Sequence, residues 1–175
     1  MRYIIFCIFI STHIFCQKIE WKEDLKLKWN NFKSESNIMN NSDIVAYAHC
    51  GWEYSAVVSS DKLTPVIIKI EAIFIEDKSW KDDKKISDYS LLHEQKHFDI
   101  AEIFARKLRR EVSEKIISSA DYIESFYKIY NKITKEYNNF QSLYDQDTKN
   151  GTNKAKQKEY NSIIINELEL LKDYK

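Results

Sequence analysis

The chain contains little glycine, proline and cysteine, and neither sign of charge is in excess. Its 175 residues include 2 Gly, 1 Pro and 3 Cys, and 27 basic residues balance 27 acidic ones. The two signs are intermixed along the chain, so the electrostatic footprint typical of nucleic-acid-binding proteins is missing. We therefore expect no nucleic-acid partner.

One apolar run, residues 3–16, follows the single basic residue Arg2. It is too short to span a bilayer and fits the apolar core of a secretory signal. We predict a signal peptide over residues 1–16, cleaved after Cys16, and hence a secreted or periplasmic protein. Lipid attachment to Cys16 is the alternative, but residues 13–15 lack the small side chains that it favours. No later run approaches transmembrane length, so we expect no stable membrane insertion.

The predicted mature chain, residues 17–175, has the length of a single domain and retains only Cys50. An exported domain with one cysteine has no internal disulfide, so its stability depends on packing. His49 precedes Cys50, but adjacent residues in a strand point to opposite faces, which argues against a nucleophile–base pair. We expect Cys50 to be a small buried residue.

Strand-like patterns occupy the first part of the chain, and helical patterns occupy the second. Alternating or β-branched runs predict strands at 25–29, 44–48, 54–58 and 66–75, with a turn or bulge at 50–51. Helices are expected after caps at Ser87 or Asp88 and at Ser118 or Ser119, and at 154–171, with Gly151 closing the second. This order predicts an α+β domain, in which an antiparallel or mixed sheet is followed by about three helices.

The most informative stretch is His93-Glu94-Gln95-Lys96-His97. Residues 91–108 contain no Gly or Pro and carry apolar residues at helical spacing, which predicts a helix. Histidines four residues apart lie on one face of a helix, where both can bind one zinc ion (Zn2+). Glu94 can then act as general base on a zinc-bound water. The pattern predicts metal ligands at His93 and His97 and a catalytic role for Glu94.

The alternative interpretation is the buried face of an ordinary amphipathic helix. His93 and His97 share a stripe with apolar residues at 100, 101, 104, 108 and 112. A single histidine in such a stripe is more often a core residue than a ligand. Two histidines at metal spacing, with an acid at the catalytic offset, favour the metal site.

Residues 91–102, Leu-Leu-His-Glu-Gln-Lys-His-Phe-Asp-Ile-Ala-Glu, continue into Ala-Arg-Lys-Leu at 105–108. This segment resembles the HEQ-x-HFDI signature of a bacterial family of unknown function, whose members are described as predicted secreted zinc-dependent proteases. A second block is also similar, with Tyr144-Asp145, Thr148, Asn150-Gly151 and Gln-Lys-Glu-Tyr at 157–160. The resemblance implies a zincin-like fold and cleavage of a peptide or protein substrate.

The chain departs from that family at Asn150, where the family has a histidine before the glycine. A catalytic zinc usually takes three protein ligands, and an amide oxygen is a poor third one. Asp99 and Glu102 lie about 160° and 140° around the helix from His97, so the third ligand must come from a distant segment. The candidates are Asp145 and Asp147, which we favour, and Asn150 and His49.

These observations lead to a first hypothesis, a secreted zinc metallopeptidase-like protein. Tyr144 is a candidate donor to the developing oxyanion. Strand 66–75 is the expected edge strand beside the metal helix, where zincins hold substrate by strand addition. The second hypothesis, motivated by Asn150, is an exported binding or structural protein that keeps the fold without turnover. A third is a helical interaction protein whose histidines have no ligand.

Overall fold

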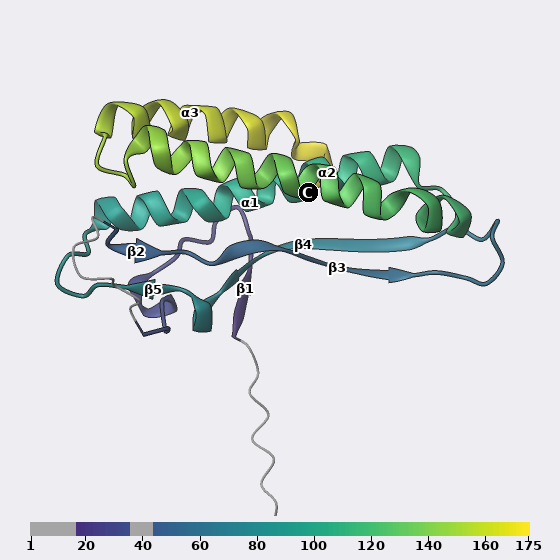
Figure 1. The fold of residues 1–175 in the computed structure, drawn as a ribbon, viewed down its shortest axis with the longest axis horizontal. Coiled ribbons are helices and arrows are strands. Elements are labelled where there is room, and N and C mark those ends of the chain that lie inside the picture. The colour runs from purple at the N-terminus through teal and green to yellow at the C-terminus, as the bar shows by residue number, and fades with distance from the viewer. Residues whose placement is uncertain (1–16, 36–43) are drawn as a thin grey trace, which may run out of the picture.

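The computed structural model describes residues 17–35 and 44–175 of the chain (Figure 1). The predicted signal peptide, residues 1–16, lies outside these ranges. The strands are β1 (Lys18–Glu20), β2 (Ala46–Tyr47), β3 (Cys50–Val57), β4 (Ile67–Ile75) and β5 (Trp80–Lys81). The helices are α1 (Asp88–Lys115), α2 (Ser119–Thr148) and α3 (Lys154–Leu170), with short 3-10 turns at Trp29–Asn31, Glu76–Lys78 and Lys172–Tyr174.

The strands form two antiparallel sheets, one of order β1-β4-β3 and one of order β2-β5. Since three helices follow the strands, the predicted α+β class is confirmed. The two-residue period of β4 places Ile70, Ala72 and Phe74 on one buried face. However, β4 is paired on both sides, so the prediction that strand 66–75 is an edge strand is wrong.

Helix α1 lies against the larger sheet, and α2 and α3 cover its other side (Figure 1). It is therefore enclosed by both layers, and Phe98, Ile103 and Phe104 are almost completely buried. Each of these side chains contributes on the order of 1.5–3 kcal/mol of hydrophobic stabilisation. Helix α2 also reaches the sheet directly, because Tyr137 and Trp52 of β3 stack edge to face at 5.0 Å.

The helix boundaries follow from capping residues near the predicted positions. Ser87 caps α1 by accepting a hydrogen bond from the amide of Ser90, and Ser118 caps α2 in the same way. Helix α2 ends at Thr148, and its C-cap is Lys149, which has a left-handed φ of 50°. The prediction that Gly151 closes this helix is therefore wrong by two residues. No helix among the described residues is long and apolar enough to cross a membrane.

Two local predictions are wrong. Residues 25–29 form no strand, because the amide of Leu27 donates to the side-chain oxygen of Gln95 rather than to a neighbouring strand. Residues 50–51 form no turn but pair with β4 at the start of β3, in the register Cys50 to Phe74. In both cases a partner distant in sequence decides where the backbone hydrogen bonds go.

Candidate metal centre

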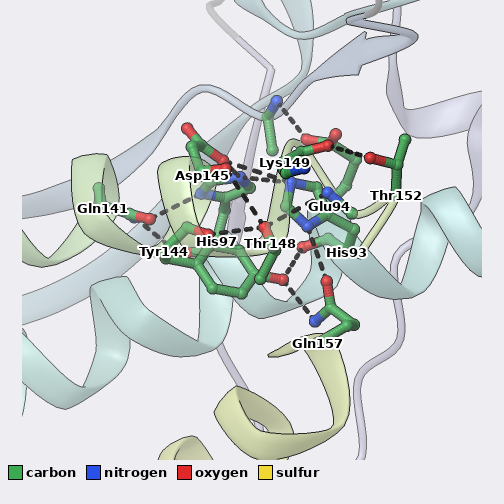
Figure 2. Close-up of polar contacts among 12 residues, drawn as sticks. His93, Glu94, His97, Gln141, Tyr144, Asp145, Thr148, Lys149, Thr152 and Gln157 are labelled. Carbon is green, nitrogen blue, oxygen red and sulfur yellow. Dashed lines mark hydrogen bonds and ion pairs between the residues drawn. The ribbon is translucent and has the colours of Figure 1, made fainter. Parts of the chain in front are cut away.

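Helices α1 and α2 bring the side chains of His93, His97 and Asp145 together (Figure 2). The Nε2 atoms of His93 and His97, one turn apart on α1, are 3.2 Å from each other. Asp145 of α2 places its Oδ1 atom 3.3 Å from Nε2 of His93 and 3.0 Å from Nε2 of His97. These three atoms form a triangle, and within the described ranges this is the group of His, Cys, Asp or Glu that could hold a metal ion.

The size of the triangle fits a small tetrahedral metal ion. Ligand atoms about 2.0–2.1 Å from zinc, at tetrahedral angles, stand about 3.3 Å apart. The three edges measured here are 3.0, 3.2 and 3.3 Å. The side chain of Asp145 is 42% exposed, whereas that of His93 is 4% exposed, so the triangle is open on the side of Asp145.

The outer ring nitrogens of both histidines contact glutamine side chains. Nδ1 of His93 lies 2.9 Å from Oε1 of Gln157, which comes from α3. Nδ1 of His97 lies 2.6 Å from Oε1 of Gln141, one turn before Asp145 on α2. Each imidazole is thus held at its far side, and its Nε2 faces the triangle.

The electrostatics of the group favour a cation among these atoms. Burial by itself lowers the pKa of His97, but the hydrogen bond to Asp145 and the charge of Glu94 outweigh it and raise the pKa to about 9. Burial also opposes ionisation of Asp145, yet hydrogen bonds from His93 and His97 hold its pKa well below the ordinary value. Without metal the group therefore retains a proton at neutral pH, and a metal ion would take its place.

Glu94 is almost fully buried and lies beside the triangle (Figure 2). Its Oε2 atom accepts a hydrogen bond of 2.9 Å from the amide of Ala48, which fixes the carboxylate against the start of β3. Burial raises the pKa of Glu94, and the nearby imidazoles of His97 and His93 partly oppose that rise. A carboxylate with a raised pKa accepts a proton more readily than an exposed one.

The triangle and Glu94 line a cavity of about 390 Å³. Its walls come from α1, from α2 and from residues 44–50. The segment that contains β2 therefore borders the site, in the place that the sequence analysis assigned to strand 66–75. Cys50 is half-buried in this wall, and burial raises the pKa of its thiol well above the ordinary value. Its thiol is therefore neutral, and Cys50 has no ligand atom in the triangle.

The remaining candidate ligands lie outside the triangle. Oδ2 of Asp147 accepts a hydrogen bond from the hydroxyl of Tyr160 at 2.8 Å. Asn150 lines the cavity, and its backbone N–H donates to the backbone carbonyl oxygen of Asp145. The ring of His49 packs against Tyr47 at 6.0 Å, and burial lowers its pKa. Among the four candidates, Asp145 alone joins the two histidines.

Tyr144 packs against His93 and does not line the cavity. Its ring stacks on that of His93 at 4.7 Å, and its hydroxyl donates to the carbonyl oxygen of His93 at 3.2 Å. The prediction of an oxyanion donor at Tyr144 is therefore wrong, because its side chain is fully buried and does not line the cavity. Gly151, with a φ of 83°, packs so closely that a Cβ there would lie 3.0 Å from Cγ of His93.

Gln141 is the residue that the sequence analysis missed. A signal was present, since Gln141 and Asp145 are four residues apart and flank the apolar stripe of α2. No family model, curated protein or solved structure matches the chain. The resemblance to the HEQ-x-HFDI family, and the zincin-like fold it implies, therefore remain predictions.

Proposed function

We propose that this protein is a secreted or periplasmic zinc-dependent hydrolase that cleaves peptide bonds. One observation carries the proposal: two imidazole nitrogens and a carboxylate oxygen, 3.0–3.3 Å apart, share a cavity with a buried glutamate. Imidazole and carboxylate are ligands that zinc prefers, and three protein ligands leave a position free for water. The resemblance of residues 91–102 supports the peptide substrate.

His93, His97 and Asp145 would hold the ion. Zinc, when bound, polarises a scissile carbonyl and makes a water molecule more acidic. Asp145 supplies one negative charge, and both histidines bind through Nε2 as neutral imidazoles. This ligand set would offset part of the charge of the zinc ion. It would also replace the histidine that the family has at the position of Asn150, because the carboxylate of Asp145 would be the third ligand.

Glu94 acts as the general base and then as the general acid. Its carboxylate takes a proton from the attacking water and delivers it to the leaving amine. The hydrogen bond from Ala48 occupies Oε2 and keeps the carboxylate from rotating. Because burial raises the pKa of Glu94, both proton transfers are closer to balance near neutral pH.

The cavity has room for a short stretch of extended peptide. Its volume of about 390 Å³ is within the range of about 300–1,000 Å³ that is typical of ligand pockets. Tyr47 of β2 and Tyr137 of α2 contribute apolar surface to its walls, where uncharged side chains of a substrate can pack. Internal peptide bonds flanked by uncharged residues are the substrates to test first.

The test combines metal content with hydrolysis of a quenched fluorescent peptide mixture. Wild-type protein should bind about one zinc and cleave, whereas Glu94→Gln should bind zinc and lose about 10²–10⁴-fold in turnover. Glu114→Gln, an exposed change on the same helix, is the matched control and should cleave normally.

Two results contradict the proposal in different ways. Wild-type protein that cannot bind added zinc would remove the metal site altogether. Zinc binding without any Glu94-dependent cleavage would instead support the alternative, an exported binding or structural protein that keeps the metal site without turnover.

A further inference from the structure

Gln157 and Gln141 contact the outer ring nitrogens of the histidines from two different helices. In each glutamine the side-chain oxygen faces the imidazole, and the side-chain nitrogen makes a hydrogen bond elsewhere. Gln157 of α3 is 1% exposed, and Gln141 of α2 is half-buried. Which nitrogen of each imidazole carries the proton depends on which end of each amide faces it. The neighbouring groups determine that orientation.

For Gln157, the decisive neighbour is Tyr144. The Tyr144 hydroxyl donates its proton to the carbonyl oxygen of His93, which can only accept. The hydroxyl oxygen is then left as an acceptor for Nε2 of Gln157, at 2.7 Å. Oε1 of Gln157 must therefore face Nδ1 of His93, at 2.9 Å, and that nitrogen carries a proton (Figure 2).

For Gln141, the decisive neighbour is the backbone of α1. Its Nε2 lies 3.1 Å from the carbonyl oxygen of His97, which accepts and cannot donate. The amide nitrogen must point to that carbonyl, so Oε1 points to Nδ1 of His97, at 2.6 Å. Nδ1 of His97 therefore also carries a proton.

We propose that Gln141 and Gln157 are positioning residues that hold a proton on Nδ1 of both imidazoles, so that the rings adopt the Nδ1–H tautomer when both are neutral. In that tautomer the lone pair of each Nε2 is directed into the triangle with Asp145, where a metal ion needs it. Both acceptors are uncharged amides, so they orient the imidazoles without adding negative charge to the site. The inference rests on the proposed metal site and names the residues that prepare it.

The first experiment measures zinc affinity by competition with a chromophoric chelator. Gln157→Met and Gln141→Met keep the side-chain size but remove the acceptor, and each should weaken zinc binding about 10–100-fold. Gln146→Met, an exposed change on α2, is the control and should leave the affinity unchanged.

A conservative variant separates positioning from packing. Gln157→Glu keeps an oxygen toward His93, and both the Tyr144 hydroxyl and the Asn161 amide can turn to donate to its other oxygen. It should therefore restore the affinity lost in Gln157→Met. Equal weakening by Glu and Met would show that Gln157 acts through packing alone and would overturn the proposal for His93.

The second experiment reads the tautomers directly. In zinc-loaded wild-type protein with ¹⁵N-labelled histidine, both imidazoles should show an Nδ1-bound proton and an unprotonated Nε2. Ring nitrogens with the opposite assignment would overturn the inference, and this reading requires no variant to fold. If wild-type protein binds zinc but both Met variants bind it equally well, the inference is wrong while the proposed metal site stands.

Discussion

Helix α1 carries two buried polar faces, and they differ in what their hydrogen-bonding groups contact. One face holds His93, Glu94 and His97 and borders the cavity. The other holds Gln95, Asp99 and, further along, Glu102 with Arg106 and Arg109. It faces residues 21–27 and residues 168–174. Composition alone does not separate them, because both place ionisable side chains beside apolar neighbours.

On the second face, the polar side chains contact partners within the protein. Asp99 accepts hydrogen bonds from Trp21 at 3.1 Å, from Gln95 at 2.9 Å and from Lys96 at 2.6 Å. Gln95 in turn accepts from the amide of Leu27. These hydrogen bonds hold residues 21–27 against α1.

Glu102 and two arginines extend the same network toward the C-terminus. Arg106 donates to Glu102 at 2.7 Å and to the carbonyl oxygen of Leu168 at 2.7 Å. Arg109 donates to Glu102 at 3.0 Å and to the carbonyl oxygen of Tyr174 at 2.9 Å. Because the charges are paired and the carbonyls are used, this cluster holds parts of the fold together.

On the cavity face, the two glutamines and the amide of Ala48 hold the side chains in place, and the groups that border the cavity contact one another. The glutamines occupy the outer nitrogens, while the two Nε2 atoms and Oδ1 of Asp145 are directed at one another beside an open cavity. A polar cluster enclosed by the protein stabilises the fold, whereas one whose potential ligand atoms converge beside a cavity is suited to a ligand. Variants on the two faces should therefore separate stability from metal binding.

Breaking the second face should have the largest effect, and on stability alone. Glu102→Gln leaves Arg106 and Arg109 as incompletely compensated buried charges, so the free energy of unfolding should fall by about 3–5 kcal/mol. Denaturant unfolding measures this, with exposed Glu114→Gln as the control. The folded fraction should bind zinc as tightly as the wild type, and a loss of affinity would show that the two faces are coupled.

Breaking the cavity face should affect metal binding. Asp145→Ala removes a ligand and should weaken zinc affinity by more than about 100-fold, the upper range for loss of an outer partner. Asp147→Ala, two residues away and bonded to Tyr160, should change it little. Isothermal titration of both variants decides the matter, and the reverse ranking would place the third ligand at Asp147.

The ion pair in the metal-free site should make stability depend on pH. The pKa of His97 is about 9 in the folded protein, above its ordinary value of 6.5. A raised pKa contributes stability that is fully present below pH 6.5 and is lost as the pH rises through 9. With a chelator present, Tm should therefore fall between pH 6.5 and pH 9.5, and it should fall less in Asp145→Asn. Parallel pH profiles for the two proteins would contradict this coupling.

The smallest effect is expected at Asn150. Its φ of 50° is tolerated by histidine, so Asn150→His should fold. Because Asp145 already stands at the third position, zinc affinity should change by less than about threefold, well below the loss of a ligand. A large gain in affinity, measured by the same titration, would show that a third imidazole displaces Asp145.

The sequence predicted the part of this site that one helix can build. The spacing of His93 and His97, and serine caps of the type found at Ser87 and Ser118, depend on local geometry that recurs in every α-helix. The absence of Gly and Pro from residues 91–108 predicted a continuous helix there, and the structure confirms it. Three of the four predicted strand regions also contain strands, since their alternation reflects a face buried against the helices.

Only the tertiary structure chose between Asp145 and Asp147. Two residues apart on α2, they point about 160° away from each other, so the rotation of α2 against α1 decides which one meets the histidines. The same long-range packing placed Gln157 of α3 behind His93 and gave the backbone of Leu27 a side-chain partner. Periodicity identifies which face of a helix is buried. It does not identify which residue of another element lies opposite, because that depends on the phase, crossing and register of whole elements.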